Sequence, residues 1–176
     1  ILRLCGLSMA FFFVRKILAI QSDSVTEFYS IIYSRLENSI GQKLDSYIQL
    51  YCYTRLKHSL DVAYYSFFIA KVFGWDCRST ARAGLLHDLF LYDWRDDSYD
   101  GKLHAINHPT IALENARKIC DLTMVEEDII KKHMWLITPI PTRYKEGFIV
   151  TFVDKACATR EFFISVFSKS DVRAVY

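Results

Sequence analysis

Residues 81–92, ARAGLLHDLFLY, are the most informative stretch of this sequence. Apolar side chains occupy most positions after Arg82, which is typical of a helix that is buried on most of its sides. Asp76 lies a few residues upstream and is expected to cap this helix. The apolar run nevertheless holds an adjacent His87 and Asp88. Because a buried carboxylate costs several kcal/mol unless it is paired or binds a metal, we expect this pair to have a functional role.

Helical patterns continue on both sides of this stretch. Ser24-Val25-Thr26-Glu27 forms a capping box, which predicts that a helix begins there, and Gly74 is expected to end a helix that begins near Thr54. Pro109 suits the first position of a later helix. The expected helices are 24–38, a segment through Leu44, Ile48 and Tyr51, 54–73, 77–92, 109–121, 125–135 and 145–168. Residues 94–108, WRDDSYDGKLHAINH, are expected to form a surface loop, and 138–142 an extended turn.

About seven helices without a convincing strand predict an all-α bundle, and the composition agrees. The chain has 176 residues with only 6 glycines and 3 prolines, which disfavours sandwiches and barrels with many tight turns. A formal net charge of +2 provides no broad basic surface, so nucleic acid is not an expected partner. The 5 cysteines include no C-x-x-C pair, which disfavours a disulfide framework and a thiolate zinc site. We therefore expect a protein of the reducing cytoplasm.

The start of the chain is strongly apolar but is interrupted by Arg3, Arg15 and Lys16. The apolar run between Leu4 and Val14 is shorter than the roughly 20 residues that span a bilayer. No membrane span is expected. We predict an N-terminal apolar helix or extension over 1–22, packed or amphipathic, with a membrane-proximal remnant as the alternative. A single helical domain is predicted over 23–176.

Two further ionisable residues lie in apolar helical patterns. His58 stands in RLKHSLDVA near the start of one expected helix, and Asp154 stands in FIVTFVDKACA inside another. Taken alone, each fits a surface or salt-bridged residue. Three helices that each carry a ligand-type side chain are better explained by one shared cause. A metal ion is such a cause, because it compensates the burial of imidazole and carboxylate groups together.

The order RLKHSLDVA, GLLHDLF, NHPTIALENA, IIKKHMW and FVDKACATRE resembles the HD superfamily of metal-dependent phosphohydrolases, over about residues 54–162. The resemblance implies an all-helical bundle whose ligands are His58, His87, Asp88 and Asp154. His108 and His133 fill the places of two further histidines found in several branches. In that six-residue version His58, His87 and Asp154 hold one ion, His108 and His133 hold another, and Asp88 touches both. Iron, manganese, zinc, cobalt and nickel all suit such ligands, so the metal is not distinguished.

The implied reaction is hydrolysis of a phosphomonoester or phosphodiester of a nucleotide or related small molecule. A hydroxide that bridges the ions is the expected nucleophile, and His87 and Asp88 are expected to be the catalytic residues. Lys57 and Arg143 are basic residues that we consider as phosphate contacts. Candidate substrate contacts are Arg95, Lys102, His104 and Lys155.

The sequence departs from many family members at Leu91, where they carry lysine or arginine; Arg95, one helical turn later, is the expected substitute. The alternative function is a catalytically weak HD module for ligand sensing or protein interaction, to which the 15% aromatic content would contribute an interface. A structural or DNA-binding bundle with incidental histidines is a second alternative. A homo-oligomer is compatible with each of these interpretations.

Overall fold

Helix α4, Arg55–Phe73, is central to the fold in this computed structural model, which describes residues 21–36, 48–50, 53–92 and 101–173. Thr54 caps its start by accepting a hydrogen bond from the Lys57 N–H at 3.3 Å. Gly74 ends it with a φ of 69°, a left-handed conformation that glycine adopts without a Cβ penalty. The predicted start of the helix near Thr54 and the predicted end at Gly74 are confirmed.

Helix α5, Cys77–Leu86, follows at once and is capped by Asp76, as predicted. It ends six residues before the expected boundary at 92. The segment that follows contacts α4 instead of continuing the helix: the buried Arg55 guanidinium donates hydrogen bonds to the backbone carbonyls of Phe90 and Tyr92, at 2.6 and 3.3 Å. These carbonyls are therefore satisfied by a side chain of another helix. The apolar run through 89–92 reflects burial rather than helix.

Gly84 lets α4 and α5 approach closely. A Cβ at this position would lie 2.9 Å from the Cα and 3.2 Å from the backbone nitrogen of Ala63. Both distances are shorter than ordinary van der Waals contact, so a side chain here would push the two backbones apart.

Three other expected boundaries are wrong. α2, Gln21–Leu36, begins three residues before Ser24, which is buried inside the helix instead of capping it. α6, Gly101–Ile119, includes the second half of the expected loop, so Pro109 lies inside the helix instead of at its first position. Ile48 belongs to a strand. β1, Ile48–Leu50, pairs antiparallel with β2, Tyr53–Thr54. Residues 1–20, 37–47, 51–52 and 93–100 lie outside the described residues. Most of the predicted N-terminal apolar helix therefore lies outside them, as do Leu44 and Tyr51 of the predicted second segment.

The last two helices match the expected segments with shifted ends. α7, Met124–Lys132, begins at a capping box between Thr123 and Glu126 and ends at His133. α8, Lys145–Arg173, extends five residues past the predicted end at 168. The non-helical connection between them includes the expected turn at 138–142 and Leu136, whose φ is 85°.

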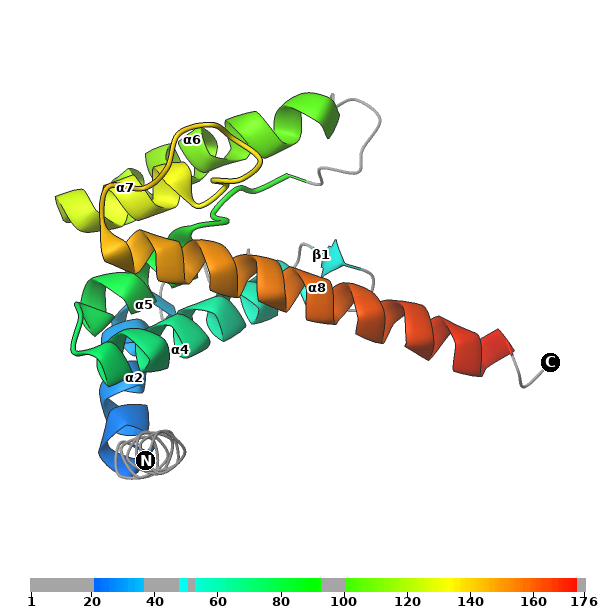
Figure 1. Cartoon of the computed structure of the whole chain (residues 1–176), viewed down its shortest axis with the longest axis horizontal. Helices are drawn as coiled ribbons and strands as arrows, with labels where there is room; N and C mark the ends of the chain where they lie inside the picture. The colour runs from blue at the N-terminus through cyan, green and yellow to red at the C-terminus, as the bar shows by residue number, and fades with distance from the viewer. Residues whose placement is uncertain (1–20, 37–47, 51–52, 93–100, 174–176) are drawn as a thin grey trace, which may run out of the picture.

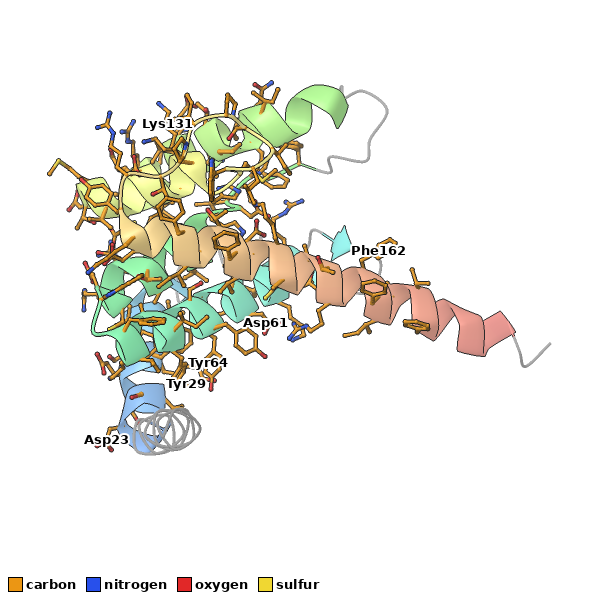
Figure 2. The ribbon with its side chains drawn as sticks, viewed as in Figure 1. Asp23, Tyr29, Asp61, Tyr64, Lys131 and Phe162 are labelled. Carbon is orange, nitrogen blue, oxygen red and sulfur yellow. The ribbon has the colours of Figure 1, made fainter. Side chains whose placement is uncertain are left out.

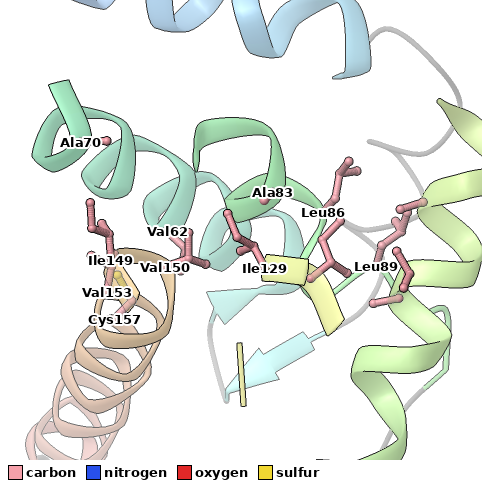
Figure 3. Packing of buried hydrophobic residues seen from close by; sticks show 14 residues of the cluster. Val62, Ala70, Ala83, Leu86, Leu89, Ile129, Ile149, Val150, Val153 and Cys157 are labelled. Atoms are coloured by element: carbon pink, nitrogen blue, oxygen red, sulfur yellow. The ribbon is translucent and has the colours of Figure 1, made fainter. Parts of the chain in front are cut away.

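In the view of Figure 1, α8 crosses the molecule between α4 and α5 on one side and α6 and α7 on the other. It contacts α4, α5 and α7. The main core lies among these helices, and Figure 3 shows Val62 of α4, Ala83 of α5, Ile129 of α7 and Val150 of α8 within it. A second cluster joins α2 to α4 and α5.

The expected all-α class is confirmed, with six helices rather than about seven in the described residues and one small ribbon of two strands. None of the described helices combines the length and the apolar character that a membrane span requires.

Candidate metal centre

Six buried residues from five helices or their ends converge inside this bundle, and each is at most 8% exposed. His58 lies in the first turns of α4, His87 and Asp88 directly follow α5, His108 lies in α6, His133 caps α7 and Asp154 lies in α8. These are the six residues predicted as ligands: His58, His87, Asp88, His108, His133 and Asp154.

Asp154 lies between two of the histidines. Its Oδ1 atom is 3.1 Å from the Nε2 atom of His58 and 3.6 Å from the Nε2 atom of His87. One carboxylate oxygen of α8 thus meets imidazoles from α4 and α5.

Asp88 faces both groups of histidines with different oxygens. Its Oδ2 atom is 3.7 Å from His87 Nε2. Its Oδ1 atom is 3.3 Å from His108 Nε2 and 3.6 Å from His133 Nε2, and these two imidazole nitrogens are 3.0 Å apart. The carboxylate of Asp88 therefore stands between a group formed with His58, His87 and Asp154 and a group formed by His108 and His133.

Two of the histidines are oriented by the helices that they terminate. The Nδ1 of His87 is 2.7 Å from the carbonyl of Gly84, and the Nδ1 of His133 is 2.8 Å from the carbonyl of Ile130. The last carbonyls of a helix have no intrahelical partner, so each can accept a hydrogen bond from the imidazole three residues later. An Nδ1–H donated in this way leaves the Nε2 lone pair pointing into the cluster.

His58 is oriented by a side chain instead. The two carboxylate oxygens of the fully buried Glu161 are 3.0 and 3.1 Å from His58 Nδ1. Glu161 is not among the residues predicted from the sequence. Its spacing could have indicated that it faces the site, because it lies seven residues after Asp154 and therefore on the same side of α8, two turns later.

The side chains of the cluster differ in the direction in which their surroundings shift their pKa values. Burial disfavours the charged form of His58, but hydrogen bonds to Asp154 and Glu161 outweigh it and raise the pKa of His58 to about 10. Burial, reinforced by His87 and His108, lowers the pKa of His133 to about 3. Burial also opposes ionisation of Asp88 and Asp154, yet the surrounding histidines hold the pKa of both carboxyls well below the ordinary range.

These residues fit a metal ion. The cluster contains three overlapping groups of three residues, and within each group one potential ligand atom per residue lies within 4.8 Å of the other two. The groups are His58, His87 and Asp88; His87, His133 and Asp154; and Asp88, His108 and His133. The Nε2 atom of His87 is buried and has no hydrogen-bond partner among the described residues, although such atoms are normally paired. Imidazole and carboxylate donors suit divalent transition metals, whose charge would satisfy that atom. The cluster could therefore hold a metal ion.

Of the described residues that are predicted to contact phosphate or substrate, Lys155 lies beside the centre. Lys155 donates a hydrogen bond to the His133 carbonyl at 3.1 Å, and its Nζ atom is 3.6 Å from Asp154 Oδ2. Lys57 is exposed and pairs with Asp61, while Arg143 lines a separate hollow between α6 and α7. Arg95 lies outside the described residues. The expected spacing of Leu91 and Arg95 on one helix is wrong, because α5 ends at Leu86.

Lys102 and His104 lie in the first turns of α6, so the expectation of a loop position for them is wrong. Their side chains lie outside what the structure describes. His104 consequently stays a predicted substrate contact, as Lys102 does.

Comparisons of the chain with protein-family profiles, with curated proteins and with solved structures find no match. The fold and the site nevertheless define a class: an all-helical protein with a buried histidine and carboxylate cluster that could bind metal.

Proposed function

We propose that this chain is a metal-dependent phosphohydrolase of the HD superfamily that acts on a phosphomonoester or phosphodiester, with a nucleotide as the favoured substrate class. The observation that carries the proposal is the position of Asp88. Its two oxygens face two different groups of ligand-type residues, at 3.3 to 3.7 Å from their imidazole nitrogens. This is the arrangement that a carboxylate bridging two ions requires.

Two divalent ions in such a centre would lower the pKa of a coordinated water and neutralise charge on a phosphoryl group. In this proposal His58, His87 and Asp154 hold one ion, His108 and His133 the other, and Asp88 both. Burial of all six residues keeps their orientations fixed. A rigid arrangement of this kind positions the reacting groups without a further entropy cost at the moment of reaction.

Lys155 is the best supported phosphate contact among the predicted ones. It lies beside the centre, and its side chain is 27% exposed, so it faces both the ligands and the solvent. Its hydrogen bond to the His133 carbonyl sets the position of the ammonium group. We propose that this group attracts the phosphate of an incoming substrate towards the ions.

Metal content tests the proposal first. The protein is purified without chelators or a histidine tag and is analysed for elements beside His108→Ala and Asp88→Asn, with Asp61→Asn as a control in an acidic residue that pairs with Arg160. We expect two ions per chain, about one after His108→Ala, and fewer after Asp88→Asn. One ion that is unaffected by His108→Ala would reduce the site to the four-residue version. A metal-free protein would contradict the proposal.

Turnover separates the enzyme from the alternative, a catalytically weak HD module for sensing or interaction. Half-exposed phenylalanines along α8 favour that alternative, because they offer an apolar contact surface: Phe152, Phe162 (Figure 2) and Phe163. Hydrolysis of a panel of nucleotide phosphomonoesters and phosphodiesters, measured by chromatography of the products with the metal that the protein retains, is expected for the enzyme and lost in Asp88→Asn. Metal-loaded protein without turnover on any phosphoester would favour the alternative.

A further inference from the structure

Glu161 is a buried carboxylate that the proposed reaction does not use. It is fully shielded from solvent in α8, two turns after Asp154. Its oxygens lie 3.0 and 3.1 Å from His58 Nδ1, and Asp154 Oδ1 lies 3.1 Å from the opposite nitrogen of the same ring. Helix α8 therefore holds the His58 imidazole between two carboxylates.

This support differs from that of the neighbouring histidines. His87 and His133 each donate from Nδ1 to a backbone carbonyl of their own helix. A carbonyl is neutral, whereas an ionised carboxylate is a stronger acceptor that increases the electron density on the opposite ring nitrogen. His58 should consequently be the more basic ligand.

Carboxylates gather around His58 and His87. Asp154 and Glu161 lie on this side in addition to the shared Asp88. A divalent ion is attracted to this side, because the interaction between buried charges is weakly screened.

We propose that Glu161 is a positioning residue: it fixes His58 with Nε2 towards the ion and strengthens the metal subsite formed by His58, His87 and Asp154. This inference rests on the proposed two-ion centre. It predicts that removing the Glu161 charge weakens metal binding at that subsite and leaves the ion at His108 and His133 unaffected.

A competition titration tests this assignment. Metal-free protein is titrated with Zn²⁺ against a chromophoric chelator, so that the two binding steps are measured without any substrate. Glu161→Gln keeps the size of the side chain and a carbonyl acceptor for Nδ1–H but removes the charge. We expect it to weaken one of the two binding steps by about 10 to 100-fold, the usual effect of changing a partner of a metal-bound histidine, and to leave the other unchanged. His108→Ala identifies the steps, because it should lose the one that Glu161→Gln leaves unchanged.

Two further variants make the result specific. Glu161→Leu also removes the acceptor, so the same step should weaken more than in Glu161→Gln. Glu146→Gln is the matched control, because Glu146 is another buried glutamate of α8 and accepts from the Asp76 N–H instead of a histidine. Its two steps should equal those of the unaltered protein.

The outcomes separate this inference from the proposed function. Unaltered protein that binds no Zn²⁺ overturns both. Two steps in the unaltered protein that stay the same in Glu161→Gln and Glu161→Leu overturn the role of Glu161 alone, as does an equal weakening of both steps. Should Glu161→Leu not fold, Glu161→Gln alone still tests the inference, because it removes only the charge and a merely structural role would not weaken one binding step selectively.

Discussion

Replacing Gly84 with alanine should separate the two helices that carry His58 and His87. The added Cβ would lie 2.9 Å from the Cα and 3.2 Å from the backbone nitrogen of Ala63, against at least 3.4 Å for an ordinary contact. α4 and α5 must therefore move apart by about half an ångström. No side-chain rotation relieves this, because the atoms in contact belong to the backbone.

Two opposing effects set the size of the loss. Overpacking a core costs about 1–3 kcal/mol, and a clash with a backbone belongs to the upper part of that range. Alanine is a better helix former than glycine by about 1 kcal/mol, which offsets part of the cost. We expect Gly84→Ala to lower the free energy of unfolding by about 1–2 kcal/mol, or the melting temperature by about 2–8 °C.

Denaturant unfolding of metal-free protein measures this change directly. Ala63→Gly in the same chain is the control: it removes the Ala63 Cβ but leaves the atoms that clash, so it should not restore Gly84→Ala. Zn²⁺ affinity should fall too, since His87 is oriented through the Gly84 carbonyl. Unchanged or increased stability of Gly84→Ala would refute the close approach of α4 and α5.

Four other perturbations have defined outcomes. Gly74→Ala should cost about 1 kcal/mol, because its φ of 69° is left-handed, while Leu136→Gly should stabilise by about 0.5–1 kcal/mol, because a leucine now holds a φ of 85°; chemical unfolding midpoints check both. In metal-free protein, stability should be greatest near pH 6.5 and fall on either side. The pKa of His58 is raised to about 10, so its contribution is complete below 6.5 and is lost as the pH rises through 10. The pKa of His133 is lowered to about 3, so its contribution is complete above 6.5 and is lost as the pH falls through 3. A pH series of unfolding midpoints in chelator would contradict this if it were flat. Finally, removing bound metal should lower the melting temperature by about 5–10 °C, because an ion at 100 times its Kd contributes about 2.7 kcal/mol; calorimetry before and after verified removal tests it.

Gly74 and Asp76 could be predicted as helix ends, because each acts within a few residues of the chain, through a left-handed φ or a side-chain acceptor. The local pattern at Ser24 is misleading, because the helix continues through this residue and buries it. The non-helical path of the residues after Leu86 could not be predicted, because Arg55 reaches the carbonyls of Phe90 and Tyr92 from another helix. An apolar run indicates burial equally well whether or not it is helical.

Most candidate ligands could be predicted from the sequence because they are ionisable residues in apolar segments. A histidine or aspartate among apolar residues conflicts with its surroundings, so His87, Asp88 and Asp154 stand out in the sequence. Glu161 does not, because it follows Arg160 and looks like a residue on a solvated helix face until the fold turns it towards His58. Its role depends on a contact across 103 positions of the chain, which no local pattern encodes.

The two ways of orienting the histidines imply an order of assembly during synthesis. His87 and His133 meet their carbonyl acceptors three residues away, so each ring can be aligned as soon as its own helix forms. His58 emerges early but waits for the last helix, which brings Asp154 and Glu161. In a nascent chain that has not yet extended through α8, His87 and His133 can therefore already be aligned, whereas His58 still lacks Asp154 and Glu161.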